Sequence, residues 1–271
     1  IWTQLANFDG AARGGAVGFS INGKGYIGTG RDLNMVFYND LWEYDPAQNT
    51  WTQKANFGGA ARGAAVGFSI GKKGYVGTGL SYYTIPNEMK DFWEYNPDTD
   101  AWLQKANFPV IKSNAVGFSI AGMGYIGTGT DISSSYGNYS AKFYQYNPNT
   151  DTWTQKADFG GDARKLAIGF SIGNKGYLGT GTSRDQNALT DFWEYNPVTD
   201  VWIAKSSTIG RQFAVGFSIG KNGYIGTGKK ISMISQNDFW QYTPETIISW
   251  DNGVVNGVAF TPTATNTYTA T

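Results

Sequence analysis

The sequence predicts an all-β protein that is built from five copies of one unit. The stretch AVGFSI at residues 16–21, closely followed by GYIGTG at 25–30, returns nearly letter for letter at a spacing of about 47 to 52 residues. Aromatic residues make up 16% of the chain, charged residues only 15%, and 37 of the 271 residues are glycine. This is a composition of strands and turns rather than helices. The phenylalanines that mark the five units are Phe19, Phe68, Phe118, Phe170 and Phe217.

Each unit reads as four short strands. In the first complete unit they are expected at residues 15–21, 25–29, 40–44 and 50–54, because apolar and polar residues alternate there. The turn Asn22-Gly23-Lys24 joins the first two strands, and Asp45-Pro46 closes the third.

The first strand of every unit contains a glycine, and the last two strands contain large aromatic residues. Glycine within a strand indicates close approach by another backbone, as the innermost strand of a radial array requires. The aromatic residues are expected to fill the wedges between neighbouring sheets. The glycines are Gly18, Gly67, Gly117, Gly169 and Gly216, and the fourth-strand tryptophans are Trp51, Trp102, Trp153 and Trp202.

The two ends of the repeated region are complementary. Residues 1–8, IWTQLANF, match the fourth-strand segment WTQKANF at 51–57, so the chain opens with an unpaired fourth strand. In the other units Trp follows Pro by five residues, but after Pro244 that position is Ser249. We therefore expect residues 1–8 to complete the last sheet and close a ring, which hides both sheet edges. The prediction is a five-bladed β-propeller over residues 1–244.

These features resemble the kelch repeat, a four-stranded blade of about 50 residues. The resemblance rests on Ala12-Arg13, Tyr26-Ile27-Gly28, the segment WEYDP at 42–46 and Thr50-Trp51. It covers residues 1–244 and is nearest to secreted bacterial kelch-repeat proteins. The adjacent glycine pair of the family is here Gly-Thr-Gly, and five blades are fewer than the usual six or seven. The Thr-rich residues 245–271 resemble the opening strands of an immunoglobulin-like adhesion module; a strand pair packed on the propeller, or a linker, is the alternative.

Composition narrows the functional classes. Twenty-one basic and 21 acidic residues leave no net charge to attract nucleic acid, and no apolar run is long enough to cross a membrane. The chain has no Cys and no His, so thiol nucleophiles, imidazole bases and the usual zinc sites are excluded. We expect no cofactor and no metal. A start at Ile1 within a repeat motif favours a mature secreted or cell-surface chain, and secretion without Cys favours a bacterial one.

Two sets of residues are candidates for ligand binding. The connections between the second and third strands, at 31–39, 80–90, 130–141, 182–190 and 229–237, vary within an otherwise uniform chain. They contain Tyr beside Ser and Asn, as antibody paratopes do: Tyr38, Tyr82, Tyr83, Tyr136 and Tyr139. Free drift of surface loops is the alternative explanation.

The second set is one cation per unit, six residues before the marker phenylalanine: Arg13, Arg62, Lys112, Arg164 and Arg211. Lys142 of the third unit is a further candidate. In a closed ring they would surround one mouth of the channel and attract carboxylates, sulfates or phosphates. Ordinary pairing within the scaffold is the alternative. Four third strands begin with Asp40, Asp91, Asp191 or Asp238, and the unit that has Lys112 has Lys142 instead of Asp. This joint change indicates that Arg and Asp are partners.

The leading functional hypothesis is a secreted or cell-surface binding module that recognises a protein or glycan through the variable loop face, with an anionic ligand as one option. One alternative is a structural bead of an adhesin or filament, which self-associates through residues 245–271. Another is a polysaccharide hydrolase or lyase that uses loop carboxylates among Asp32, Glu88, Asp131 and Asp185, although no spacing selects a pair. We expect no catalytic residue, since no catalytic motif is present.

Overall fold

The computed structural model describes residues 3–81, 89–131, 138–230, 232 and 234–245. Within these residues every regular element is a strand, so the all-β prediction is confirmed. The strands form six small antiparallel sheets, and five of these sheets are each made by one repeat unit.

Each repeat sheet follows chain order from its inner to its outer strand. The first consists of β1 (Val17–Ile21), β2 (Lys24–Gly28), β3 (Leu41–Asp45) and β4 (Thr50–Lys54), and the second of β5 (Val66–Ile70), β6 (Lys73–Gly77), β7 (Phe92–Asn96) and β8 (Ala101–Lys105). The third consists of β10 (Val116–Ile120), β11 (Met123–Gly127), β14 (Phe143–Asn147) and β15 (Thr152–Gln155). The fourth consists of β16 (Ile168–Ile172), β17 (Lys175–Gly179), β18 (Phe192–Asn196) and β19 (Val201–Lys205). The last has three strands, β20 (Val215–Ile219), β21 (Asn222–Gly226) and β22 (Phe239–Tyr242).

The third unit carries an addition. Strands β9 (Lys112–Ser113), β12 (Thr130–Asp131) and β13 (Asn138–Tyr139) form a separate small sheet in the order β13-β12-β9. It lies where the connection between the second and third strands leaves the repeat sheet. This end of the sheets, where all such connections emerge, is called the loop face below.

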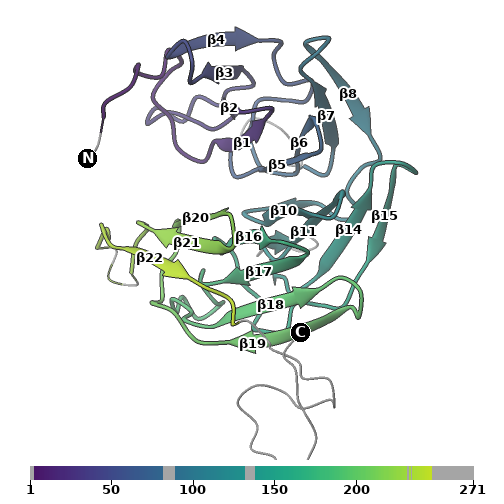
Figure 1. The fold of residues 1–271 in the computed structure, drawn as a ribbon, viewed down its shortest axis with the longest axis vertical. Helices are drawn as coiled ribbons and strands as arrows, with labels where there is room; N and C mark the ends of the chain where they lie inside the picture. The colour runs from purple at the N-terminus through teal and green to yellow at the C-terminus, as the bar shows by residue number, and fades with distance from the viewer. Residues whose placement is uncertain (1–2, 82–88, 132–137, 231, 233, 246–271) are drawn as a thin grey trace, which may run out of the picture.

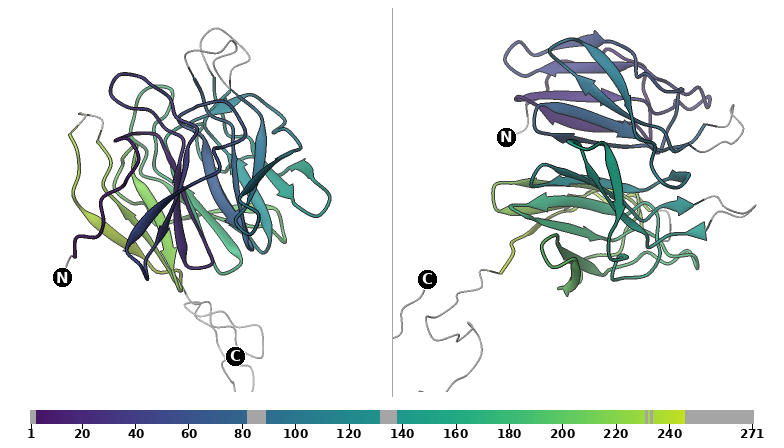
Figure 2. Two further views of the ribbon diagram at one scale, coloured as in Figure 1. Left: turned by 90° about the horizontal axis from the view of Figure 1, so that it is seen from above. Right: turned by 90° about the vertical axis from the view of Figure 1, so that its right-hand side faces the viewer.

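The five repeat sheets are arranged around a common centre, with their first strands innermost (Figures 1 and 2). Neighbouring inner strands contact each other in the series β1, β5, β10, β16, β20. The fold is therefore β-propeller-like. Strands β20 and β1 make no contact, so the described residues form an arc with an open side between the last and first sheets.

A knob-and-hole contact joins each sheet to the next. A Cβ atom added to Gly67 would lie 2.6 Å from the Cβ atom of Val17, and one added to Gly74 would lie 2.5 Å from the ring of Phe19. Only glycine leaves room for the preceding sheet at these positions. The same contact recurs along the arc, and it buries the marker phenylalanines Phe68, Phe118 and Phe170.

The expected closure by residues 1–8 is not formed in the described part of this segment. Residues 3–8 make no strand and do not pair with β22. They dock instead on the first sheet: the backbone N–H of Ala6 donates to Asn49 Oδ1 over 2.9 Å, and Phe8 packs edge-on against Trp51 at 5.0 Å. The same contacts hold the segments between other units, where Ala55 N–H bonds Asp100 and Phe57 meets Trp102. Residues 3–8 thus sit where the end of a preceding fourth strand would lie.

A candidate functional site at the mouth of the loop face

The four arginines of the predicted cationic ring are paired with aspartates of their own units. Arg62 donates to both oxygens of Asp91, over 2.6 and 2.7 Å, and to the carbonyl oxygen of Thr78 over 2.8 Å. Arg13 with Asp40, Arg164 with Asp191 and Arg211 with Asp238 repeat this arrangement. The Arg62, Arg164 and Arg211 side chains are buried. The pairing inferred from the joint change is therefore confirmed, and these arginines form no open cationic ring.

The third unit pairs its lysines differently. Lys112 is fully buried and donates to Asp131 and to the carbonyl oxygen of Thr128. Lys142, which is half exposed, bonds Asp158 over 3.0 Å at the surface. Neither lysine contributes to an open cationic ring, because each has a carboxylate partner. Lys112 uses an aspartate from the variable connection rather than from the third strand, a pairing that the repeat pattern does not predict.

The paired carboxyl groups stay ionised in the fold. Burial raises the pKa of Asp91, but the hydrogen bonds and positive charge of Arg62 outweigh it, so the net pKa is lowered. The same balance lowers the pKa of Asp40 and Asp191. At Asp238 the hydrogen bond from Arg211 is the largest effect and lowers the pKa to about 2. The aspartates therefore anchor the arginines rather than serving as proton donors near neutral pH.

Two of the five candidate tyrosines lie in the described residues, and both have contacts within the protein. Tyr38 donates to Asp32 over 3.2 Å, and Arg13 lies 4.4 Å from the centre of its ring. The hydroxyl of Tyr139 accepts from Gln186 over 3.2 Å, and the ammonium of Lys165 lies 4.8 Å from its ring centre. Tyr139 thus joins the loop faces of the third and fourth units. Tyr82, Tyr83 and Tyr136 lie outside the described residues.

A chain of backbone hydrogen bonds links the first four units just before their inner strands. The N–H of Ala64 donates to the carbonyl oxygen of Gly15, that of Asn114 to Ala64, and that of Leu166 to Asn114. The corresponding residue of the last unit is Phe213. All five residues adopt the left-handed backbone conformation, with φ between 53° and 66°. For Leu and Phe this conformation is strained.

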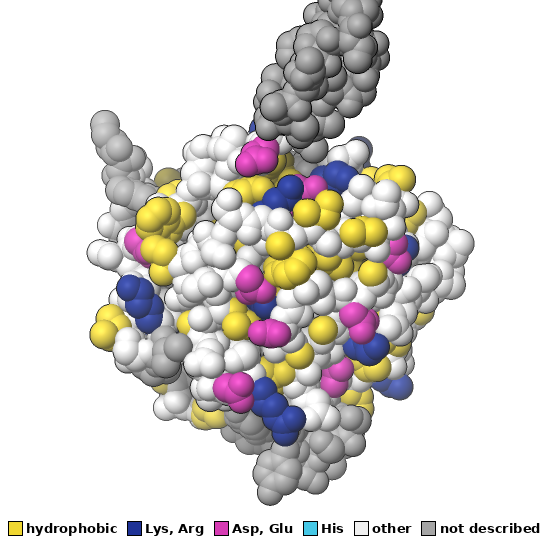
Figure 3. Space-filling model, turned by 90° about the horizontal axis from the view of Figure 1, so that it is seen from below, with side chains coloured by type: hydrophobic (Ala, Val, Ile, Leu, Met, Phe, Trp, Pro, Cys, Tyr) yellow, Lys and Arg dark blue, Asp and Glu magenta, His cyan; other side chains and the backbone are white. Residues whose placement is uncertain are grey.

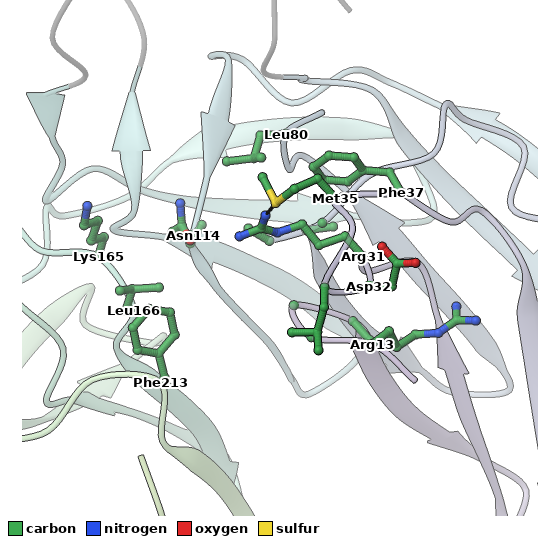
Figure 4. Close-up of a pocket in the computed structure, with 18 of the residues that line it drawn as sticks. Arg13, Arg31, Asp32, Met35, Phe37, Leu80, Asn114, Lys165, Leu166 and Phe213 are labelled. Carbon is green, nitrogen blue, oxygen red and sulfur yellow. Dashed lines mark hydrogen bonds between the residues drawn. The ribbon is translucent and has the colours of Figure 1, made fainter. Parts of the chain in front are cut away.

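The side chains at these five positions differ although their backbone does not. Gly15 and Ala64 leave space, whereas Asn114, Leu166 and Phe213 extend over the centre (Figure 4). The residues at all five positions, together with Arg31, Leu80 and Lys165, line a cavity of about 1100 Å³ at the loop face. Leu166 and Phe213 form an apolar wall on one side, and Arg31 reaches in from the other (Figure 4). We call the eight residues Gly15, Arg31, Ala64, Leu80, Asn114, Lys165, Leu166 and Phe213 the mouth.

The sequence contains a signal for the mouth outside the variable connections. The residue directly before the repeated Ala of the inner strand changes from unit to unit, although the segment that follows it recurs. Its importance depends on two facts that only the structure supplies: the five positions meet around one cavity, and their backbone is left-handed.

Charges of both signs are mixed on the side of the molecule that Figure 3 shows. On the side shown in Figure 3, Lys and Arg side chains alternate with Asp and Glu rather than gathering by sign. Among the described residues there is no cluster of acidic side chains suited to a metal ion. The same part of the chain contains no helix of the length and apolarity needed to span a bilayer.

The geometry defines an all-β, propeller-like protein with a cavity at one end of its sheets. In comparisons with known proteins, the solved structure described as "Structure of YjhT" has this fold, with a TM-score of 0.76 and 15% sequence identity. The alignment covers 95% of this chain and 88% of that one. At this identity the likeness shows the fold alone. No family model matches the sequence, and no curated protein matches it.

Proposed function

We propose that residues 1–244 form a five-bladed kelch-like β-propeller whose last sheet is completed by residues 1–8. Five repeat sheets in series support the blade number. In the other units, the segment that follows a fourth strand docks on the next sheet through the same contacts that residues 3–8 make with the first sheet. This similarity supports residues 1–8 as the fourth strand of the last sheet. The Thr-rich tail expected at residues 245–271, as the start of an immunoglobulin-like module or as a linker, lies from residue 246 onwards outside the described residues.

The proposed role is that of a secreted or cell-surface module that binds a protein or glycan through its loop face. The mouth carries this proposal. A constant, strained backbone presents different side chains around one cavity, and strain of this kind is retained where it positions a functional group. Arg31 and Lys165 bring two positive charges to the cavity against the one negative charge of Asp32, whose carboxylate accepts from the N–H groups of Asn34 and Val36. An anionic ligand suits this charge.

A binding screen tests the role directly. Arrays of neutral and acidic oligosaccharides and of extracellular matrix proteins are incubated with the intact chain and with a Tyr139→Ala, Lys165→Ala double variant. Binding that the double variant loses supports the proposal. The matched control is Lys72→Ala, which changes an exposed lysine in the turn between β5 and β6, at the opposite end of the sheets. Equal binding by all three proteins, or no binding, contradicts a loop-face site.

One observation favours the alternative role of a structural bead. The last sheet leaves several large apolar side chains exposed, among them Phe239 and Ile219. A surface of this kind indicates association with another protein surface. The exposed apolar side chains belong to the last sheet, and residues 246–271 lie outside the described residues. The observation therefore supports a bead that associates through its last sheet.

A further inference from the structure

The cavity at the mouth is lined mainly by apolar side chains. One alanine per unit, directly after the left-handed position, lines it, and Leu80, Leu166 and Phe213 add larger apolar groups. The alanines are Ala16, Ala65, Ala115, Ala167 and Ala214. Among the described residues that line the cavity, Asn114 is the only one with a neutral polar side chain. The cavity therefore offers contact area to an apolar group and few hydrogen bonds to a polar one.

The backbone around the cavity is largely paired as well. Gly14 and Arg31 exchange two N–H to carbonyl hydrogen bonds of 2.8 and 3.0 Å, and the equivalent residues of the second, fourth and fifth units repeat this exchange. The chain of bonds through Ala64, Asn114 and Leu166 uses further N–H groups. A sugar ring carries hydroxyls on most of its carbons, and burying a hydroxyl without a partner is unfavourable. The cavity is thus poorly matched to a sugar.

Two cations reach the same cavity from opposite sides (Figure 4). The guanidinium of Arg31 lies 6.0 Å from the ring centre of Phe37, and the ammonium of Lys165 lies 4.8 Å from that of Tyr139. Cation–π attraction favours these positions of the two charges. A charge beside an apolar surface attracts an anion more strongly than it would in open water. An acid group on the ligand is therefore the expected partner.

The charge balance of the cavity favours a ligand with one negative charge. Of the charged residues that line it, Arg13 is neutralised by Asp40. Arg31 and Lys165 then exceed Asp32 by one charge. A carboxylate carries this single charge, whereas a phosphate monoester carries nearly two at neutral pH.

We infer that the mouth binds an apolar group that carries a single carboxylate, rather than a sugar. This inference rests on the proposed function, in which the mouth is the binding site, and it narrows the class of ligand. The apolar group packs against Leu166 and Phe213, and the carboxylate lies between Arg31 and Lys165. Two sources have this chemistry: the C-terminal residue of a protein, where its side chain is apolar, and a free aryl or alkyl carboxylic acid.

Calorimetric titration of the intact chain with matched probes tests the ligand class. The free acid is 3-phenylpropionate, and 3-phenylpropanol is its neutral match. The protein end is an N-acetylated peptide with a C-terminal phenylalanine and a free carboxylate, and its neutral match is the same peptide with a C-terminal amide. Each acid is expected to bind about tenfold or more tightly than its neutral match, because hydrogen bonds to a charged group are the stronger ones. A glucuronate trisaccharide is the sugar probe, expected to bind about tenfold or more weakly than the acids.

Two variants separate the contact with the carboxylate from the contact with the apolar group. Lys165→Met keeps the length of the side chain and removes its charge, so it should lower the preference for acid over neutral match by about tenfold. Phe213→Ala should weaken the acid and its neutral match alike, by about tenfold, and leave that preference unchanged. A disturbed fold would weaken all probes without changing the preference. Leu103→Ala, on the exposed strand β8, is the control and should bind as the wild-type chain does.

The outcomes separate this inference from the proposed function. Binding of the peptide acid, of the free acid or of both, with the expected preference, supports the inference and identifies the source. Tighter binding of the trisaccharide, lost in Lys165→Met, overturns it but leaves a loop-face binding module standing. Equal binding of acids and neutral matches, or equal binding by the wild-type chain and both variants, shows that the mouth does not recognise the carboxylate. Binding of no probe also contradicts the inference, and the array screen then decides the proposed function separately.

Discussion

Arg62 and Asp91 face each other in a bidentate pair, with two parallel N–H to oxygen hydrogen bonds of 2.6 and 2.7 Å. Arg62 is 1% exposed, and its third bond goes to the carbonyl oxygen of Thr78 at the end of the inner hairpin. The pair therefore ties the segment before the first strand to the start of the third strand. In four of the five units this contact fixes the loop face to the sheet.

Asp91→Asn is expected to destabilise the chain by about 3 to 5 kcal/mol, because it leaves the buried Arg62 charge without a counterion. The free energy of unfolding in urea measures the effect. Lys142→Gln breaks the exposed pair with Asp158 and is the matched control, expected to cost at most about 1 kcal/mol. Equal losses for the two variants would show that burial of the pair is unimportant.

Acid is expected to weaken the fold through the same pairs. The folded pKa of Asp238 is about 2, whereas the unfolded value for Asp is about 3.9. A lowered folded pKa means that the stabilisation is complete above the unfolded value and is lost as the pH falls towards 2. The urea concentration at the midpoint of unfolding, measured between pH 7 and pH 2, reports this loss. In Asp238→Asn this midpoint should fall less steeply with decreasing pH than in the wild-type chain. An unchanged slope in that variant would contradict the assignment.

Gly74→Ala and Gly25→Ala form a matched pair of substitutions at equivalent positions. A methyl group at Gly74 would lie 2.5 Å from the ring of Phe19, so overpacking should cost about 1 to 3 kcal/mol. At Gly25 the nearest atom is 3.8 Å away, so the stability of the isolated chain should change little. Thermal unfolding at low protein concentration compares them. A comparable loss for Gly25→Ala would indicate that its face is already covered by the same chain.

Phe213→Gly is expected to raise the free energy of unfolding by about 1 kcal/mol, because glycine adopts the positive φ of 57° without strain. Little packing is lost, since Phe213 is largely exposed. The same substitution should weaken any ligand bound at the mouth, which the binding screen measures. Leu103→Gly, in the exposed strand β8, is the control and should lower stability. A stability loss for Phe213→Gly would show that this side chain supports the fold instead.

Local patterns in the sequence predicted the parts of the fold that depend on neighbours along the chain. The strands, the glycines that admit side chains of the preceding sheet and the pairing of Arg with Asp all follow from repetition, because each unit makes the same contacts and joint changes reveal partners. The pairing of Lys112 with Asp131 was not predictable in this way, because it occurs in one unit only.

The tertiary structure decided how the units meet. It brought Gly15, Ala64, Asn114, Leu166 and Phe213 around one cavity, although about 50 residues separate each from the next. It also left Phe239 and Gly25 uncovered, whereas the sequence predicted a closed ring. The physical reason is that a repeat specifies its own sheet and its contact with the next sheet. The angle accumulated over four such contacts, and thus whether the ends meet, is a property of the packed assembly and not of any one unit.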